Sequence, residues 1–177
     1  MLIIPEKWIR KPDEAQNGFL QAWAESGYVS VPIALETHGV ALDEVTLDRE
    51  QDFAFRAECD SEYDVFADET DFWRRRGQKY APESFVPCGL LPPPGRKRFD
   101  LTARAIINGR VTAVIENPAA FGFAKDDALF VMTCLGYEFD AVVPAAAARG
   151  RKPAVGNYVS GLFWINGCPT APRQKAG

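Results

Sequence analysis

The fold prediction starts from residues 155–167, whose sequence is VGNYVSGLFWING. β-Branched and aromatic residues fill this stretch, and Gly156, Gly161 and Gly167 divide it. Such residues suit a pleated, half-buried surface, while glycine inside a strand pattern marks a bend or a close approach. We therefore predict a final strand or hairpin here, as part of a small β structure that closes on itself.

The segments before this stretch also read as strands. Residues 129–135 and 137–143 alternate apolar and polar side chains on either side of Gly136, and residues 99–115 form a long strand candidate with Asn108-Gly109 near its middle. Gly109 permits a hairpin turn or a sharp bend. The alternation predicts a core with these large side chains: Phe130, Met132, Tyr137, Phe139 and Trp164.

The order of these elements is a long bent strand, two paired strands, a short Ala-rich connection at residues 145–148 and closing strands. Over residues 99–168 this order resembles the oligonucleotide/oligosaccharide-binding (OB) fold, a five-stranded barrel. The resemblance rests on element order alone. It implies a ligand site on one strand face and the adjoining loops.

The first quarter of the chain carries a helical pattern. Asp13 is suited to cap a helix, and Phe19, Leu20 and Trp23 recur at three- and four-residue spacing. Gly27 follows as a stop signal. We therefore predict a helix over residues 13–25.

Strands and one short helix are predicted next. Residues 28–35 read as a strand that Pro32 would confine to a sheet edge, because proline cannot donate to the ladder. Alternation around Phe53 and Phe55 predicts a second strand. Acids at the start and arginines at the end of residues 68–76 predict a short helix, since this charge order matches the helix dipole.

These elements predict an α+β fold that is mainly antiparallel β. Three successive prolines within residues 92–98 hold the backbone extended and stiff, which favours a linker. The predicted organisation is an N-terminal α+β half at 1–91, this proline-rich linker, an OB-like β-barrel at 99–168 and a flexible tail at 169–177.

Charge is divided along the chain. Residues 36–71 carry thirteen Asp and Glu against two Arg, whereas residues 74–110 carry nine Arg and Lys against two acids. Unlike charges attract within about 10 Å at ordinary ionic strength. One interpretation is that the fold brings the two blocks together and neutralises them, and the alternative is two opposite patches that face different partners.

Catalytic and metal-binding patterns are weak in this sequence. The four cysteines are far apart and His38 is the single histidine, which argues against a zinc site and favours a reduced, cytosolic protein. The acids that begin at Asp60 have EF-hand-like spacing, but Val65 replaces the glycine that the loop requires. We assign no cofactor and no metal ligand, and we favour a non-catalytic protein while leaving an enzyme open as an alternative. Neither the N-terminus nor the later apolar runs predict a signal peptide or a membrane span.

The predicted ligand surface combines cations with aromatic rings, which hold phosphates and stack bases. Its residues are Trp73, Arg74, Arg75, Arg76, Lys79, Tyr80, Arg96, Lys97 and Arg98. One observation opposes nucleic-acid binding: if Tyr137 and Phe139 face the core, Glu138 and Asp140 face outward on the strand where the OB resemblance places nucleic acid. Acids there would repel phosphate.

We therefore rank three functions for a soluble, cytoplasmic protein. The first is a non-catalytic interaction protein that meets a protein partner through charged surfaces. The second is single-stranded nucleic-acid binding through the basic clusters. The third is a metal-dependent hydrolase built on the acids of residues 58–71.

Overall fold

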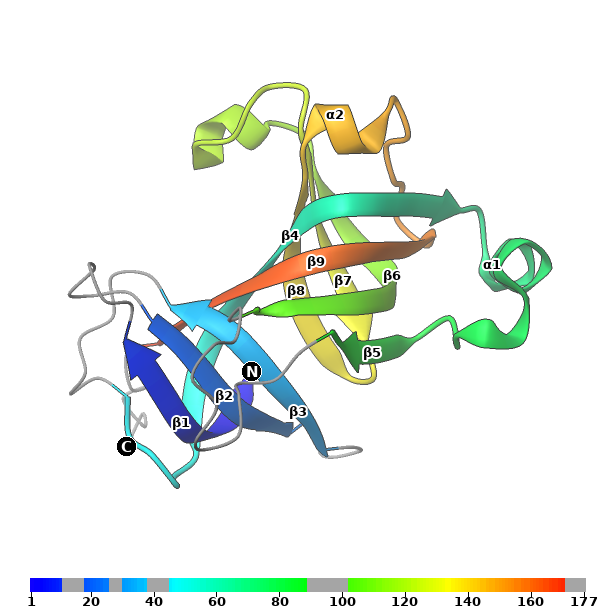
Figure 1. Ribbon diagram of the computed structural model, residues 1–177. Coiled ribbons are helices and arrows are strands. Elements are labelled where there is room, and N and C mark those ends of the chain that lie inside the picture. Colours follow the sequence, from blue (N-terminus) through cyan, green and yellow to red (C-terminus); the bar gives the residue numbers. More distant parts are fainter. Residues whose placement is uncertain (11–17, 26–29, 38–44, 89–101, 171–177) are drawn as a thin grey trace, which may run out of the picture.

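A computed structural model describes residues 1–10, 18–25, 30–37, 45–88 and 102–170. Strands make up most of this part of the chain (Figure 1). They are β1 (Leu2–Arg10), β2 (Gly18–Glu25), β3 (Ser30–Thr37), β4 (Gln51–Phe66), β5 (Ser84–Pro87), β6 (Arg104–Ile115), β7 (Ala128–Cys134), β8 (Tyr137–Val143) and β9 (Tyr158–Pro169). The helical elements are α1 (Glu69–Arg76), α2 (Ala145–Ala148) and the 3₁₀ turns η2 (Gly77–Lys79) and η3 (Pro118–Phe121).

All nine strands belong to one mixed sheet in the order β1-β2-β3-β9-β4-β8-β7-β6-β5. Two further pairings, β1 with β4 and β9 with β6, close this sheet into two circuits. Ring one contains β1, β2, β3, β9 and β4, and ring two contains β4, β8, β7, β6 and β9. Eight strands therefore take part in closed pairing, and β5 adds to β6 outside the rings.

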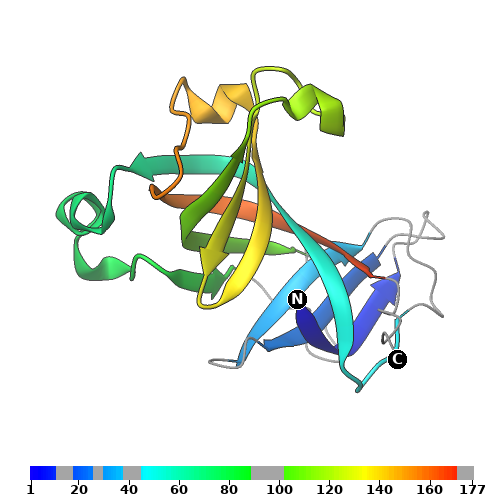
Figure 2. The ribbon, with the colours of Figure 1, turned by 180° about the vertical axis from the view of Figure 1, so that it is seen from behind.

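The antiparallel pair β4–β9 is common to both rings. Figures 1 and 2 show β1, β2 and β3 at one end of the molecule and β6, β7 and β8 at the other, with β4 and β9 running between them. The pair changes register between Cys59 and Tyr63, where the three residues Asp60–Glu62 stand opposite the single residue Leu162. Such a bulge bends a strand and increases its twist, which lets one long strand serve two rings.

The predicted core is confirmed for four of its five side chains. Phe130, Met132, Tyr137 and Phe139 are buried inside ring two. Trp164 is only partly buried, because its neighbours Phe163 and Ile165 point inward and the alternation of β9 places the indole on the outer face. The prediction that Trp164 is a core residue was wrong, because the residues on either side of it are the ones that face the core.

The predicted α+β class with an N-terminal helix is wrong. Residues 18–25 form β2, which pairs with β1 on one side and β3 on the other, and residues 11–17 lie outside the described part. In β2 the buried side chains Leu20, Ala22 and Ala24 follow a period of two, and Trp23 is exposed. The described part of the chain is mostly β, and its longest helix is the eight-residue α1.

The helix predicted for residues 68–76 is confirmed as α1. The side chain of Asp68 accepts a hydrogen bond from the backbone N–H of Asp71, which caps the first turn. Phe72 is fully buried, with its ring centroid 4.9 Å from that of Phe66 and 6.5 Å from that of Tyr158. These contacts fix α1 beyond the ends of β4 and β9, on the side away from ring one (Figure 1).

The other predicted strands are present, β8 with the predicted ends and the others with altered ends. Residues 129–135 and 137–143 correspond to β7 and β8, and β6 runs unbroken through Asn108-Gly109. The predicted strand at 28–35 appears as β3, where Pro32 pairs with Trp23 of β2. The linker at 92–98 and most of the tail lie outside the described residues, so the division into two halves stays a prediction. Within the described ranges, no helix has the length and apolar character needed to cross a membrane.

Candidate functional site

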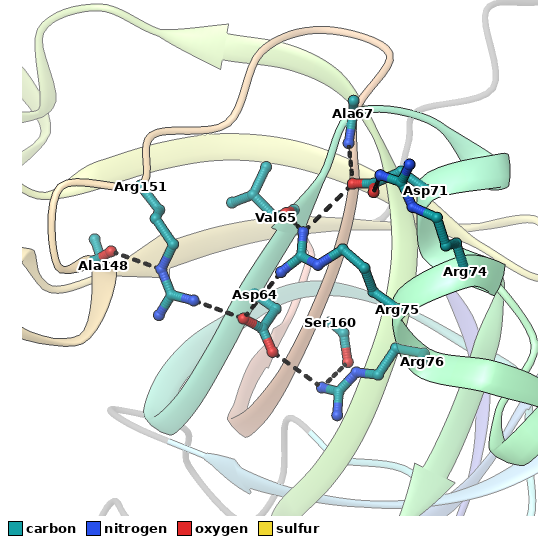
Figure 3. Close-up of polar contacts among 10 residues, drawn as sticks. All are labelled: Asp64, Val65, Ala67, Asp71, Arg74, Arg75, Arg76, Ala148, Arg151 and Ser160. Atoms are coloured by element: carbon teal, nitrogen blue, oxygen red, sulfur yellow. Dashed lines mark hydrogen bonds and ion pairs between the residues drawn. The ribbon is translucent and has the colours of Figure 1, made fainter.

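The arginines of α1 lie among acids rather than facing solvent alone. Arg74 forms an ion pair of 2.6 Å with Asp71, and Arg75 lies 3.3 Å from the other oxygen of the same carboxylate. Arg75 also donates to the carbonyl of Val65 over 2.8 Å. These contacts tie the end of α1 to the end of β4 (Figure 3).

Asp64 of β4 is the centre of this cluster. Its carboxylate lies 3.7 Å from Arg75 and from Arg76, and 2.5 Å from Arg151, which follows α2. Figure 3 shows Asp64 between Arg151 on one side and the α1 arginines on the other. Arg76 also donates to the hydroxyl of Ser160 over 2.7 Å. One carboxylate therefore connects β4, α1 and the segment after α2.

The environment of Asp71 favours its charged form. The backbone N–H of Ala67 donates to the Asp71 carboxylate, and Arg74 and Arg75 donate to it as well. These hydrogen bonds hold the pKa of Asp71 below its usual value, with the Ala67 N–H as the largest cause. The Arg74 and Arg75 guanidiniums therefore face a carboxylate that stays ionised at neutral pH.

The remaining predicted ligand residues are spread along the same segment. Trp73 is 39% exposed and donates its indole N–H to Glu69 over 3.2 Å. The Lys79 ammonium lies 5.3 Å from the centroid of the half-buried Tyr80 ring. The second predicted cluster, Arg96, Lys97 and Arg98, lies outside the described residues.

The acidic and basic blocks do face one another where both are described. Among ion pairs with two described partners, all but Arg151–Asp64 join residues 36–71 to residues 74–110. They include a contact of 3.3 Å between Asp60 and Arg104. In this part of the chain, Asp60, Asp64 and Asp71 of the acidic block pair with arginines of the basic block.

The sequence prediction missed the arginines after α2. Arg149 and Arg151 line a depression of about 260 Å³ together with Arg76 and residues 61–64. The basic run Arg149-Gly150-Arg151-Lys152 is visible in the sequence. Nothing in its spacing indicates that it would lie beside β4.

A groove lies between the two rings. Two depressions of about 250 and 480 Å³ share Ala54, Phe55 and Asp140 in their walls, and we call them together the inter-ring groove. Met1 and Glu25 line it from ring one, and residues 136–138 from ring two. The hydroxyl of Tyr137 donates to the carbonyl of Ala24 over 2.7 Å, which links the rings at this point.

The groove is acidic. Four of its lining side chains carry carboxylates: Glu25, Glu58, Glu138 and Asp140. Among the same lining side chains Arg56 is the one cation, and its guanidinium lies 5.0 Å from the centroid of Phe123. The expected register of β8 is confirmed, since Tyr137 and Phe139 are buried while Glu138 and Asp140 are exposed.

The two buried cysteines, Cys59 and Cys134, are poorly suited to act as nucleophiles. Burial is the main cause that raises the pKa of Cys59 to about 11 and that of Cys134 to about 12. A thiol with such a pKa is protonated at neutral pH and therefore a weak nucleophile. His38 lies outside the described residues. No cluster of three or more His, Cys, Asp or Glu in the described part is arranged to hold a metal ion.

Comparison with known proteins gives no relative: no family model matches the chain, and neither the curated proteins nor the solved structures yield a match.

Proposed function

We propose that this chain is a non-catalytic binding protein that meets a polypeptide partner through charged surfaces. The observation that carries the proposal is the outward position of Glu138 and Asp140 at the inter-ring groove. A groove with four carboxylates repels phosphate and attracts lysine and arginine side chains.

The pairing of the α1 arginines supports the same choice. Arg74 and Arg75 already face Asp71, so a nucleic acid would have to compete at both with a carboxylate of the chain itself. Each phosphate contact made by a free cation releases counterions, and a paired cation contributes less. The free thiols Cys88 and Cys168 are exposed, which favours a reducing compartment such as the cytoplasm.

Single-stranded nucleic-acid binding is the second candidate, favoured by the OB resemblance. In ring two, β6, β7 and β8 form an antiparallel meander, α2 follows, β9 pairs with β6, and β4 pairs with β8 in parallel. The OB fold uses the same pairings for its first to fifth strands. Here the strand in fifth place, β4, comes first along the chain. We interpret ring two as an OB-like arrangement in permuted order.

Fluorescence anisotropy at low salt separates the two candidates. The probes are a labelled peptide of alternating lysine and glycine and a labelled oligothymidylate. We expect the peptide to bind, and the double variant E138Q/D140N to weaken it by about tenfold, as two lost ion pairs would. The matched control is E116Q/D126N, which removes the same charge at two exposed acids that do not line the groove.

Three outcomes would contradict the proposal. Equal weakening by both double variants would mean that net charge alone drives binding. Binding of the oligothymidylate without the peptide, with log affinity falling linearly in log salt, would promote the second candidate. Failure of both probes to bind would remove charged-surface recognition altogether.

A further inference from the structure

The depression beside Asp64 lies where β4 is irregular. The bulge at Asp60–Glu62 brings Ser61, Glu62 and Tyr63 into its wall. Gly161 fits closely against this bulge, since a Cβ there would lie 2.9 Å from the carbonyl oxygen of Glu62. Bulges are frequent beside functional sites because they redirect side chains.

Three arginines from two separate segments reach the same depression. Arg76 is the last residue of α1, and Arg149 and Arg151 follow α2. Arg149 adopts the left-handed region with φ of 48° and ψ of 42°, which is unfavourable for a residue with a side chain. Backbone strain of this kind is concentrated at ligand sites. Two irregular backbone segments, the bulge and the end of α2, therefore meet at one set of guanidiniums.

These arginines retain unused donors. A guanidinium carries five N–H groups, and Arg151 uses Nε for the carbonyl of Ala148 and Nη1 for Asp64. The Nε of Arg76 is buried without a hydrogen-bond partner, and so is the hydroxyl of Tyr63, which also lines the depression. Arg149 is exposed and makes no ion pair with any described residue. Buried donors without acceptors are rare in proteins, so hydrogen bonding is incomplete beside the depression.

The balance of charge favours an anion. Arg76, Arg149 and Arg151 outnumber the carboxylates of Glu62 and Asp64 in the lining. The planar fork of arginine matches the oxygens of phosphate, and three forks around one space suit a tetrahedral oxyanion. Asp64 already lies between Arg76 and Arg151 as an internal carboxylate. A depression of about 260 Å³ has room for a phosphate group beside it.

We propose that the depression formed by Arg76, Arg149, Arg151 and Tyr63 binds a phosphate-type oxyanion, either free phosphate or the phosphate of a small monoester. This site is separate from the inter-ring groove and does not depend on the function proposed for it. Glu62 and Asp64 limit the affinity, and their carboxylates make the site selective for ligands that bridge several arginines.

The test uses isothermal titration of the full chain with inorganic phosphate and with ribose 5-phosphate. The main variant is R149G, because glycine accepts the left-handed backbone and the fold is kept while the guanidinium is removed. We expect R149G to weaken binding by about tenfold or more, as the loss of a charge-assisted contact does. The control R110A removes an exposed arginine of β6 outside the depression and should leave the affinity unchanged.

A second variant is expected to change the affinity for phosphate in the opposite direction. D64N removes the internal carboxylate beside the site and should tighten phosphate binding. Binding of phosphate alone would identify the free anion as the ligand, and tighter binding of ribose 5-phosphate would identify a monoester. Both results support the proposal. No heat of binding at millimolar phosphate, equal affinities for wild type and R149G, or weaker binding by a folded D64N would overturn it.

Discussion

Ring one and ring two share β4 and β9 but are closed in different ways. In ring two, β6 pairs with β9 over residues 104–110 and with β7 over residues 110–115. The parallel seam between β4 and β8 joins residues 56–58 to residues 140–142. Among the described residues, ring one is closed by Glu36 with Asn166, and by Leu2 and Ile3 with Asp52 and Gln51. Among the described residues, the closing seams of ring one therefore have shorter backbone ladders than the seam between β4 and β8, and side chains add to the closure of ring one.

The side chains that close ring one are identifiable. The indole N–H of Trp164 in β9 donates to the Glu36 carboxylate of β3 over 2.5 Å, and the Trp164 ring packs edge-on against Phe19. Tyr137 of ring two bonds to Ala24 of β2. One sheet therefore contains a ring closed mainly by backbone hydrogen bonds and a ring whose closure also uses side-chain contacts. We expect the local stability of the two rings to differ.

The largest effect is expected for the core of ring two. Phe139 is 3% exposed, stacks on Phe85 at 6.1 Å and meets Phe55 edge-on at 6.3 Å. Phe139→Ala should lower the free energy of unfolding by about 3–5 kcal/mol, measured by urea denaturation. Phe121→Ala, at a ring that is 61% exposed, should change it by less than about 0.5 kcal/mol. Similar losses in both variants would mean that Phe139 is not a core residue.

Alanine substitutions at two glycines of β9 allow the packing of the two rings to be compared directly. A Cβ at Gly161 would lie 2.6 Å from the Phe163 ring and 2.9 Å from a backbone oxygen, whereas a Cβ at Gly167 would first meet the end of the Leu35 side chain at 3.0 Å. We expect Gly161→Ala to cost about 1–3 kcal/mol and Gly167→Ala less than that, because the Leu35 side chain can move. Thermal unfolding of both variants decides the order, and a larger loss for Gly167→Ala would contradict the difference between rings.

The next largest loss of stability is expected when the hydrogen bond from Trp164 to Glu36, which helps to close ring one, is removed. Trp164→Phe keeps an aromatic ring but removes the donor to Glu36, which is 6% exposed, and should cost about 1–2 kcal/mol. Amide hydrogen exchange should accelerate in β2 and β3 before it does in β7 and β8. Trp73→Phe removes an exposed indole bond and serves as the control. Uniform acceleration in all strands would show that the rings open together.

The smallest effect is expected outside both rings. Asp68→Ala removes the N-cap of α1 and should cost about 1 kcal/mol. Exchange should rise in α1 while the protection of β2 and β7 is retained. Thr70→Ala, at an exposed position of the same helix, is the matched control. If Asp68→Ala loosened ring one as well, α1 would have to be counted as part of its closure.

The elements that could be predicted from sequence carry their signal locally. The alternation of β8 and the charges and cap of α1 lie within a few residues, and the structure confirms both. The helix predicted for residues 13–25 failed because Phe19, Leu20 and Trp23 match a helical spacing, while the small core residues Ala22 and Ala24 were not recognised. Alanine favours helices on its own, and pairing with β1 and β3 overrides that preference.

The candidate site was predictable only in part. The α1 arginines were predicted as ligand residues because they cluster beside aromatic residues in the sequence. Their pairing with Asp64 and Asp71 depends on how β4 ends. Arg151 lies 87 residues from Asp64 in sequence, and no local pattern indicates that contact. The two depressions of the inter-ring groove likewise combine segments from both rings, so their lining could not be read from any one stretch.

The shared pair has a consequence for the order in which the protein is made. Every partner of β4 in β9 is more than ninety residues further along the chain. During synthesis β4 therefore leaves the ribosome long before β9 exists, so its backbone lacks its longest ladder and Phe55 lacks its contact with Phe139. Hairpins such as β1–β2 and β7–β8 need only nearby residues. We expect nascent chains that end before β9 to require a chaperone, because an unpaired strand of this length is prone to aggregate.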